Sequence, residues 1–188
     1  MDKTAFAQIR TAVLTELSNR IQALDPNIVE ALLREILDAE RIFFAAAGRS
    51  RQMLSAFAMR VMHMGLCAHV VGDATTPAIG PGDLLLAASG SGETDTTLLL
   101  ASKAKQAGAR LAVLTAQPAS SLGQLADHVF PLLTAPQCQR PPQALQVGAA
   151  PFEESLLILG DILVILLAKE LGIQDVNATL WKNHANLE

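Results

Sequence analysis

Apolar residues recur along this chain with two different spacings, and these spacings predict where helices and strands lie. Over residues 3 to 24 the apolar positions follow a period close to 3.6, as on one face of a helix, and Asp25-Pro26 then begins a second helix that extends to about Ala39. Further along, short continuous apolar runs alternate with helical patterns. The runs predicted as strands cover residues 41–48, 68–71, 83–89, 110–115 and 128–133.

Helical patterns separate these strands and close the chain. The predicted helices cover residues 50–65, 94 to about 106, a short segment from about 120, and 151 to about 171. Strands that are apolar throughout, with helices between them, are typical of a parallel sheet that is covered on both faces. We therefore predict an α/β fold: a doubly wound, five-stranded parallel sheet in a flavodoxin-like three-layer arrangement, preceded by N-terminal helices.

The length of the chain favours one domain. Its 188 residues divide into N-terminal helices (1–40), an α/β core (41–133) and a long helix with a C-terminal tail (151–188). Residues 134 to 150 are rich in proline and glycine and predict a loop of 17 residues. A connection of this length is unusual in a compact domain, so it is a candidate functional segment.

Composition and charge narrow the classes of partner. The net charge of -4 offers no clustered basic face, so we expect no nucleic-acid binding. The most apolar segment, residues 155–168, is too short and too polar to span a bilayer, so we expect no membrane partner. Cys67 and Cys138 show no disulfide or metal-site spacing, which favours a reducing cytoplasm, and His63, His69 and His128 lack metal-ligand spacing.

The stretch "SGSGET", residues 89–94, directly follows a predicted buried strand. Glycines let a ligand approach the backbone, hydroxyls donate hydrogen bonds, and a helix N-terminus attracts negative charge, a combination that suits a phosphate monoester. A dinucleotide fingerprint would need glycine at Asp95, and the lysine motif of a P-loop is absent. An ordinary strand-to-helix turn, capped by Ser91 or a neighbour, remains the alternative. Gly48-Arg49-Ser50 ends an earlier strand in the same manner, and both could bind one anion.

These motifs make the chain similar to a known family. "SGSGET" with an earlier "GRS" resembles the sugar isomerase (SIS) domain, which binds phosphosugars. The ordered series "GRS", "AFAMRVMHMG", "VVGDATTPAI", "GDLLLAASGSGET", "FEESLL" and "HANLE" further resembles the 6-phospho-3-hexuloisomerases, from about residue 8 to the end. The resemblance implies isomerisation of D-arabino-hex-3-ulose 6-phosphate to fructose 6-phosphate in the ribulose monophosphate route of formaldehyde assimilation. It also implies a homotetramer with no metal or other cofactor.

The resemblance also assigns roles to residues. Glu153, in the first turn of the last long helix, becomes the base that moves a proton between C2 and C3, and the helix dipole favours its ionised form. His184, in the C-terminal tail, is expected to move protons between O2 and O3 of the substrate, at its own or a neighbouring subunit's site. The phosphate-binding residues implied are Ser50, Ser89, Ser91 and Thr94. Weaker expectations for substrate binding fall on Gly48, Gly90 and Arg49, whose side chain could pair with phosphate or with sugar hydroxyls.

Some positions depart from the family pattern or support other functions. Arg51 stands where the family commonly has glycine, and Ala149-Ala150 replace a pair that includes a hydroxyl, so another phosphosugar stays open as the substrate. A non-catalytic phosphosugar sensor would need the hydroxyl loops but neither Glu153 nor His184. We further expect Glu93 to bond backbone or a partner subunit rather than phosphate, and Trp181 to anchor the tail by burial.

Overall fold

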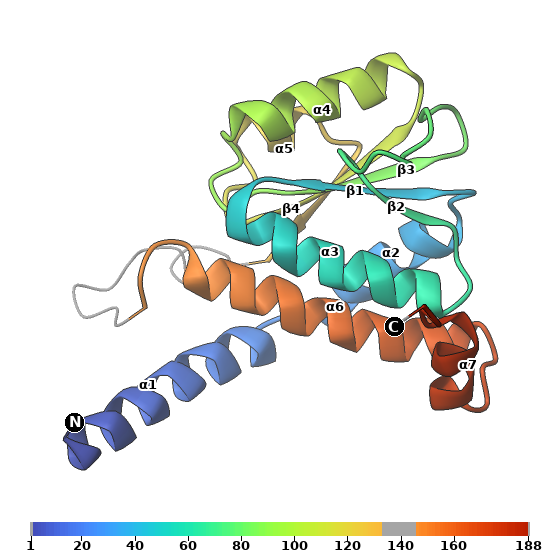
Figure 1. Ribbon diagram of the computed structural model, residues 1–188. Coiled ribbons are helices and arrows are strands. Elements are labelled where there is room, and N and C mark those ends of the chain that lie inside the picture. The colour runs from blue at the N-terminus through green and yellow to red at the C-terminus, as the bar shows by residue number, and fades with distance from the viewer. Residues whose placement is uncertain (1, 133–145, 188) are drawn as a thin grey trace.

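The computed structural model describes residues 2–132 and 146–187, and a parallel sheet forms its centre (Figure 1). The strands are β1 (Ile42–Ala46), β2 (Ala68–Val70), β3 (Leu84–Ala88), β4 (Arg110–Thr115) and β5 (His128–Pro131). Their order across the sheet is β2-β1-β3-β4-β5, and every pairing is parallel. The predicted five-stranded parallel sheet is therefore confirmed, with the strand order typical of flavodoxin-like folds.

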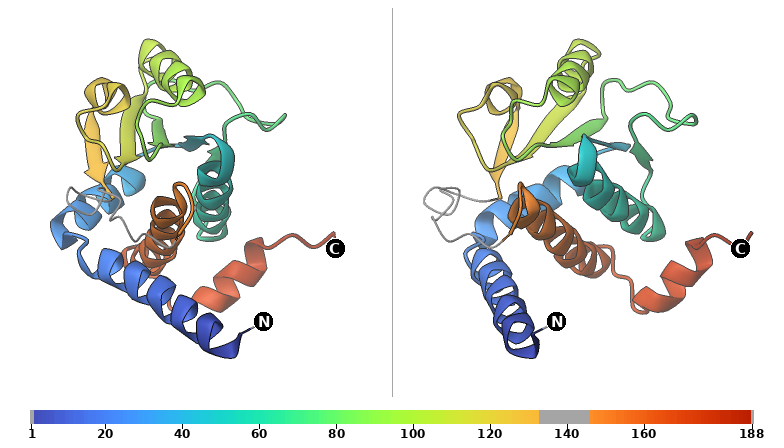
Figure 2. Two further views of the ribbon diagram at one scale, coloured as in Figure 1. Left: turned by 90° about the vertical axis from the view of Figure 1, so that its left-hand side faces the viewer. Right: turned by 60° about the vertical axis from the view of Figure 1, so that its left-hand side comes forward.

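Helices cover both faces of the sheet, as predicted for a doubly wound fold (Figures 1 and 2). On one face lie α4 (Asp95–Gln106) and α5 (Ser121–Leu125), and on the other α2 (Pro26–Leu37), α3 (Gly48–His63) and α6 (Ala150–Glu170). α1 (Lys3–Gln22) packs against α6, and α7 (Val176–Asn183) lies near the far end of α3. None of the helices described is long and apolar enough to cross a membrane.

Successive side chains of each strand supply two separate cores, because they point to opposite faces of the sheet. In β1, for example, Ile42 and Phe44 join the cluster beneath α3 and α6, whereas Phe43 and Ala45 join the cluster beneath α4. Both groups are almost fully buried. This burial on both faces explains why the strands are apolar throughout instead of alternating with polar residues.

The C-terminal end of the chain differs from the sequence predictions, because α7 forms where a tail was predicted, whereas the helix predicted over residues 3–24 is present as α1. α1 leans away from the body of the molecule (Figure 2), and its apolar residues Phe6, Ile9 and Leu14 are about half exposed, at 50%, 52% and 59%. Trp181 was expected to anchor the tail by burial, and this expectation was wrong: its side chain is 69% exposed. The tail is attached instead through Asn183, whose side-chain amide donates to the carbonyl of His63 at 2.9 Å.

Element boundaries otherwise agree with prediction to within a few residues. The clearest shift is at α3, which begins at Gly48, two residues before the expected start. Most of the predicted loop of residues 134–150, together with Cys138, lies outside the described residues, and its last residue, Ala150, begins α6.

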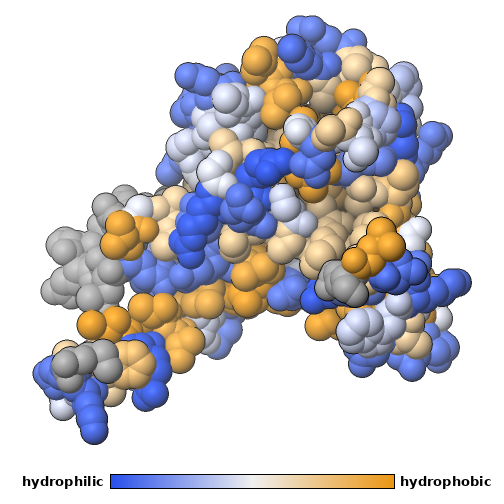
Figure 3. Space-filling model, in the orientation of Figure 1, coloured by the Kyte–Doolittle hydropathy of each residue, from blue (hydrophilic) through white to orange (hydrophobic). Residues whose placement is uncertain are grey.

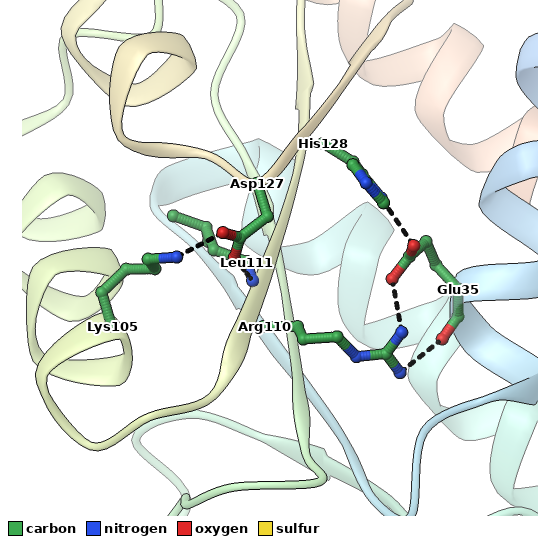
Figure 4. Close-up of polar contacts among 6 residues, drawn as sticks. All are labelled: Glu35, Lys105, Arg110, Leu111, Asp127 and His128. Atoms are coloured by element: carbon green, nitrogen blue, oxygen red, sulfur yellow. Dashed lines mark hydrogen bonds and ion pairs between the residues drawn. The ribbon is translucent and has the colours of Figure 1, made fainter.

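Polar contacts fasten the start of β4 and β5 to α2, at the edge where the parallel strands begin (Figure 4). Glu35 of α2 accepts a hydrogen bond from Arg110 at 2.9 Å and lies 2.5 Å from Nδ1 of His128. Beside this group, Asp127 accepts the N–H of Leu111 at 2.8 Å. Through these contacts His128 pairs with Glu35, at the edge of the sheet opposite to the hydroxyl-rich turns.

Asp83 is a buried carboxylate at the start of β3, and its ion pair is important for stability. It is fully buried and accepts hydrogen bonds from Arg41 Nε at 2.8 Å, Arg41 Nη2 at 2.6 Å and the N–H of Gly80 at 2.7 Å. Burial alone raises the pKa of Asp83, but the Arg41 guanidinium and the Gly80 amide together lower it below its ordinary value. Its ionised form therefore stabilises the folded state above the unfolded pKa, and this contribution is lost as pH falls through the folded pKa.

We expect Asp83→Asn to lower the free energy of unfolding by about 2–4 kcal/mol at neutral pH, because Arg41 loses its charged partner. Urea denaturation followed by circular dichroism measures this difference. As pH falls below about 4 the difference between variant and wild type should shrink, since Asp83 of the unfolded chain then binds a proton that the folded protein binds only at lower pH. Asp161→Asn, at an exposed position of α6, is the control. A constant difference across this pH range would contradict the role given to the ionised form.

Candidate active site

The two hydroxyl-rich turns predicted from the sequence leave the sheet side by side. β1 and β3 are direct neighbours, and their last paired residues are Ala46 and Ala88. Residues 48–50 and 89–94 follow these positions, so both turns lie at the carboxyl edge of the sheet. This is the edge where ligands bind in open α/β folds.

The first turn leads directly into α3 and leaves donor groups available. Gly48 has a φ of +58°, which favours glycine, and Ala47 at the N-cap provides no side-chain acceptor for the first amides of the helix. Ser50 lies in this first turn and is 9% exposed. Its hydroxyl makes no hydrogen bond to another residue in the described part of the chain. The first turn of α3 thus carries both uncapped amides and an unbonded hydroxyl.

In the second turn, two of the predicted phosphate ligands bond to each other. Ser89 Oγ accepts the N–H of Gly92 at 3.0 Å and lies 2.9 Å from the hydroxyl of Thr94. Ser91 is exposed, and its Oγ accepts the N–H of Glu93 at 3.2 Å, which leaves its own hydroxyl proton free to donate. Ser89 and Thr94 therefore shape the turn, and Ser91 is at its surface.

Contacts with α5 hold the second turn in this shape. Glu93 Oε1 accepts the N–H of Ser121 at 2.8 Å, and hydrogen bonds from the amide and hydroxyl of Ser121 lower the pKa of Glu93 below its ordinary value. The prediction that Glu93 bonds backbone is thus confirmed. Gly92 has a φ of +68°, and a Cβ there would lie 1.9 Å from Ser120 Oγ. The sequence analysis did not predict that Ser120 lies against Gly92, although a serine directly before a short helix is a recognisable N-cap signal.

Glu153 projects from the first turn of α6 and is paired with Arg49. It is 8% exposed, and its Oε2 accepts a hydrogen bond from Arg49 Nη1 at 2.7 Å. Its other oxygen has no hydrogen-bond partner within the described ranges. Arg49 was expected to pair with phosphate or sugar hydroxyls, but in the structure it pairs with Glu153. The neighbouring Glu154 instead accepts a hydrogen bond from Gln146 at 2.8 Å.

Contacts between α6 and both turns bring the carboxylate to the same edge of the sheet. A Cβ at Gly90 would lie 3.3 Å from the ring of Phe152, so the second turn packs against the start of α6. Arg49, one residue before Ser50, joins the first turn to Glu153. We call these three segments, residues 48–50, 89–94 and 152–153, the strand-end site. It combines free donors for an anion with a buried, charged carboxylate.

His184 lies elsewhere in the same chain. It follows α7, and its ring stacks on that of His63 with 5.4 Å between centroids. His63 ends α3, whereas Gly48 begins it, so the two ends of this helix are roughly 20 Å apart. Burial, followed by the charges of Arg60 and His184, lowers the pKa of His63 and keeps it neutral at pH 7. The structure therefore does not bring His184 to Glu153 within one chain.

Comparison with known proteins agrees with this geometry. The model of the SIS domain family matches residues 35–151, which include both turns and reach the first turn of α6. The chain belongs to the SIS domain family. The matched residues thus cover the sheet and both turns of the strand-end site, and they end two residues before Glu153.

Individual relatives match the SIS domain and its flanking segments together. The 3-hexulose-6-phosphate isomerase of Bacillus subtilis is 38% identical over 94% of this chain and 95% of its own length. That of Mycobacterium gastri is 41% identical over 94% of this chain and 88% of its own length. A crystal structure of a protein from Methanococcus jannaschii, for which a 3-hexulose-6-phosphate isomerase function was inferred, superimposes with a TM-score of 0.82 at 30% identity. It covers 94% of this chain and 99% of that one.

Proposed function

We propose that this protein is a 3-hexulose-6-phosphate isomerase, converting D-arabino-hex-3-ulose 6-phosphate into D-fructose 6-phosphate in the ribulose monophosphate pathway. The identity of about 40% to curated isomerases over nearly the whole chain supports the substrate. The observation that supports the chemistry is the buried carboxylate of Glu153 beside two turns suited to phosphate. A cytoplasmic location, where sugar phosphates are metabolised, is part of this proposal.

The reaction moves a carbonyl group from C3 to C2 and needs one base. Glu153 takes the proton from C2, the electrons of that C–H bond form a 2,3-enediolate, and the proton returns to C3 while the proton of the C2 hydroxyl is transferred to O3. The free oxygen of Glu153 is available for this proton. Arg49 fixes the other oxygen through its 2.7 Å ion pair and holds the carboxylate in place as an acceptor.

The phosphate group is assigned to the two turns. In this proposal the unbonded hydroxyl of Ser50 and the surface hydroxyl of Ser91 donate to phosphate oxygens, together with the first amides of α3 and α4. Ser89 and Thr94 contribute mainly by holding the second turn in shape through their mutual hydrogen bond. Gly48 and Gly90 allow the backbone to come close to the ligand.

A coupled assay tests the proposed function. Purified protein is incubated with ribulose 5-phosphate, formaldehyde and a hexulose-phosphate synthase, and the formation of fructose 6-phosphate is followed. We expect product only when both enzymes are present. Absence of product with active synthase would contradict the proposed substrate, and the same protein would then be tested on arabinose and heptose phosphates.

We propose further that the protein is a homotetramer, as its family resemblance implies. Apolar side chains gather on the surface along α1 and the neighbouring part of α6 (Figure 3). Ile9 and Leu14 of α1 and Ile165 of α6 are 52%, 59% and 57% exposed. Exposed apolar groups that lie together on a surface are typical of an interface between subunits. A second copy of this chain would bury them.

Substituting both Ile9 and Leu14 with glutamate should convert the tetramer into smaller species, because buried charges oppose the contact. Size-exclusion chromatography with light scattering measures the mass, and circular dichroism checks that the fold is kept. Thr15→Glu, on the exposed polar side of α1, is the matched control and should leave the mass unchanged. An unchanged mass in the double variant would mean that α1 lies outside the interface.

A further inference from the structure

An ion pair links the first turn of α3 to the turn that follows β2. Arg51 Nη2 lies 2.9 Å from Asp73 Oδ1, and the two side chains are 36% and 57% exposed. Arg51 is the residue directly after Ser50. Since the family that this chain resembles commonly has glycine at this position, the contact is a feature of this chain that a glycine could not provide.

The turn after β2 is otherwise bonded mainly to itself. The N–H of Asp73 donates to Val70 O at 3.2 Å, and Thr76 bonds back to Asp73 O at 3.0 Å and to Val70 O at 2.7 Å. Val70 is the last residue of β2, and among the hydrogen bonds and ion pairs of residues 72–79 in the described chain, the contact with Arg51 is the one that reaches a helix or strand other than β2. Asp73 is thus joined to α3 through Arg51 and to Thr76 through its own carbonyl oxygen.

The two threonines of this turn line a hollow that reaches Arg51, the residue after Ser50 of the strand-end site. It has a volume of about 420 Å³ and runs along α3 from Arg51 to Met62, against β2 and the turn, with both polar and apolar lining residues. The hydroxyl oxygen of Ser55 is buried there and has no hydrogen-bond partner among the described residues. The hollow therefore offers several donors and acceptors next to the proposed phosphate-binding turn, as a site for sugar hydroxyls requires.

We propose that Arg51 is a positioning residue that sets the affinity for the phosphosugar by tethering Asp73, so that Thr75 and Thr76 stay beside the first turn. It acts through the tether and not as a free cation, because its charge is already paired with Asp73. This inference rests on the proposed function, since it concerns the same ligand. The tether is half exposed, so its contribution is that of a surface ion pair.

The test is a double-mutant cycle of Arg51→Gly and Asp73→Asn, with binding of fructose 6-phosphate measured by calorimetry and kcat measured separately. We expect each variant to raise the dissociation constant about three- to fivefold, the double variant to be no worse than either, and kcat to stay within about twofold. Hydrogen exchange at the amides of residues 72–76 should accelerate in all three variants. Arg34→Gln, which removes a more exposed ion pair with Glu30 on α2, is the control.

Three results would overturn the proposal. If Asp73→Asn tightens binding while Arg51→Gly weakens it, Arg51 attracts phosphate directly. If neither variant changes binding, the tether does not matter to the ligand. If kcat falls as binding weakens, Arg51 acts on the transition state. Failure of the proposed function can be distinguished from failure of this inference. If the proposed function is wrong, the wild-type protein binds fructose 6-phosphate without isomerising it, and the double-mutant cycle can still be measured on binding.

Discussion

Replacing Glu153 with glutamine should lower kcat by about 10³-fold and leave the affinity for fructose 6-phosphate within a few fold of wild type. An amide cannot take the proton from C2, yet it has nearly the same shape and still offers an oxygen to Arg49, which lies 2.7 Å from the carboxylate. The loss should therefore fall on the chemical step, which stopped-flow or steady-state turnover measures, and calorimetry should show that ligand binding persists.

The adjacent carboxylate provides a matched control for this experiment. Glu154 shares the first turn of α6 but bonds to Gln146 and leaves the short contact with Arg49 to Glu153. Glu154→Gln should keep kcat within about threefold of wild type, because it removes the same charge from the same turn without removing the base. If both variants lose activity equally, the effect is one of local charge. If Glu153→Gln keeps its activity, another group is the base.

The sheet could be predicted because each of its strands carries its own signal. A strand covered on both faces must be apolar throughout, and β1, β3 and β4 are continuous apolar runs with helical patterns between them. The adjacency of the two hydroxyl-rich turns followed from the same pattern, because the carboxyl ends of parallel strands lie on one edge. These inferences depend on local sequence and on general rules of topology.

Contacts between distant segments could not be predicted in this way. Arg49 and Glu153 are 104 positions apart, and nothing in either motif indicates that one pairs with the other in preference to a substrate group. The ion pair between Arg51 and Asp73 could not be predicted either, because in the sequence both residues resemble ordinary surface charges. Trp181 shows the opposite failure: its size favoured burial, but the tail is attached through Asn183. A side chain's partner is fixed by packing, which sequence periodicity does not report.

His184 is the residue for which chain geometry and expected role disagree most. Its ring stacks on His63 at the end of α3 opposite to the strand-end site. Two subunits could resolve this disagreement if the tail of each contributes to the site of the other, as closed symmetric assemblies allow. We therefore propose that Glu153 and His184 of one active site come from different chains.

Mixing two inactive variants distinguishes a shared site from one contained within a subunit. His184→Ala should lower kcat by about 10²-fold, because the transfer of a proton between O2 and O3 loses its carrier. His184→Phe should lose as much, although it keeps an aromatic ring to stack on His63, which shows that the loss is chemical and not structural. Full activity in either variant would remove His184 from the mechanism.

Co-expression of the Glu153→Gln chain with the His184→Ala chain should then restore about a quarter of wild-type activity. If the two chains pair at random, half of the pairs contain one chain of each variant. In each mixed pair, one of the two shared sites has both native Glu153 and native His184, and the other site has neither. Differently tagged chains allow the mixed species to be purified and assayed against each parent alone. If the mixed species is no more active than its parents, both residues act within one chain, and the tail must leave His63 to reach Glu153.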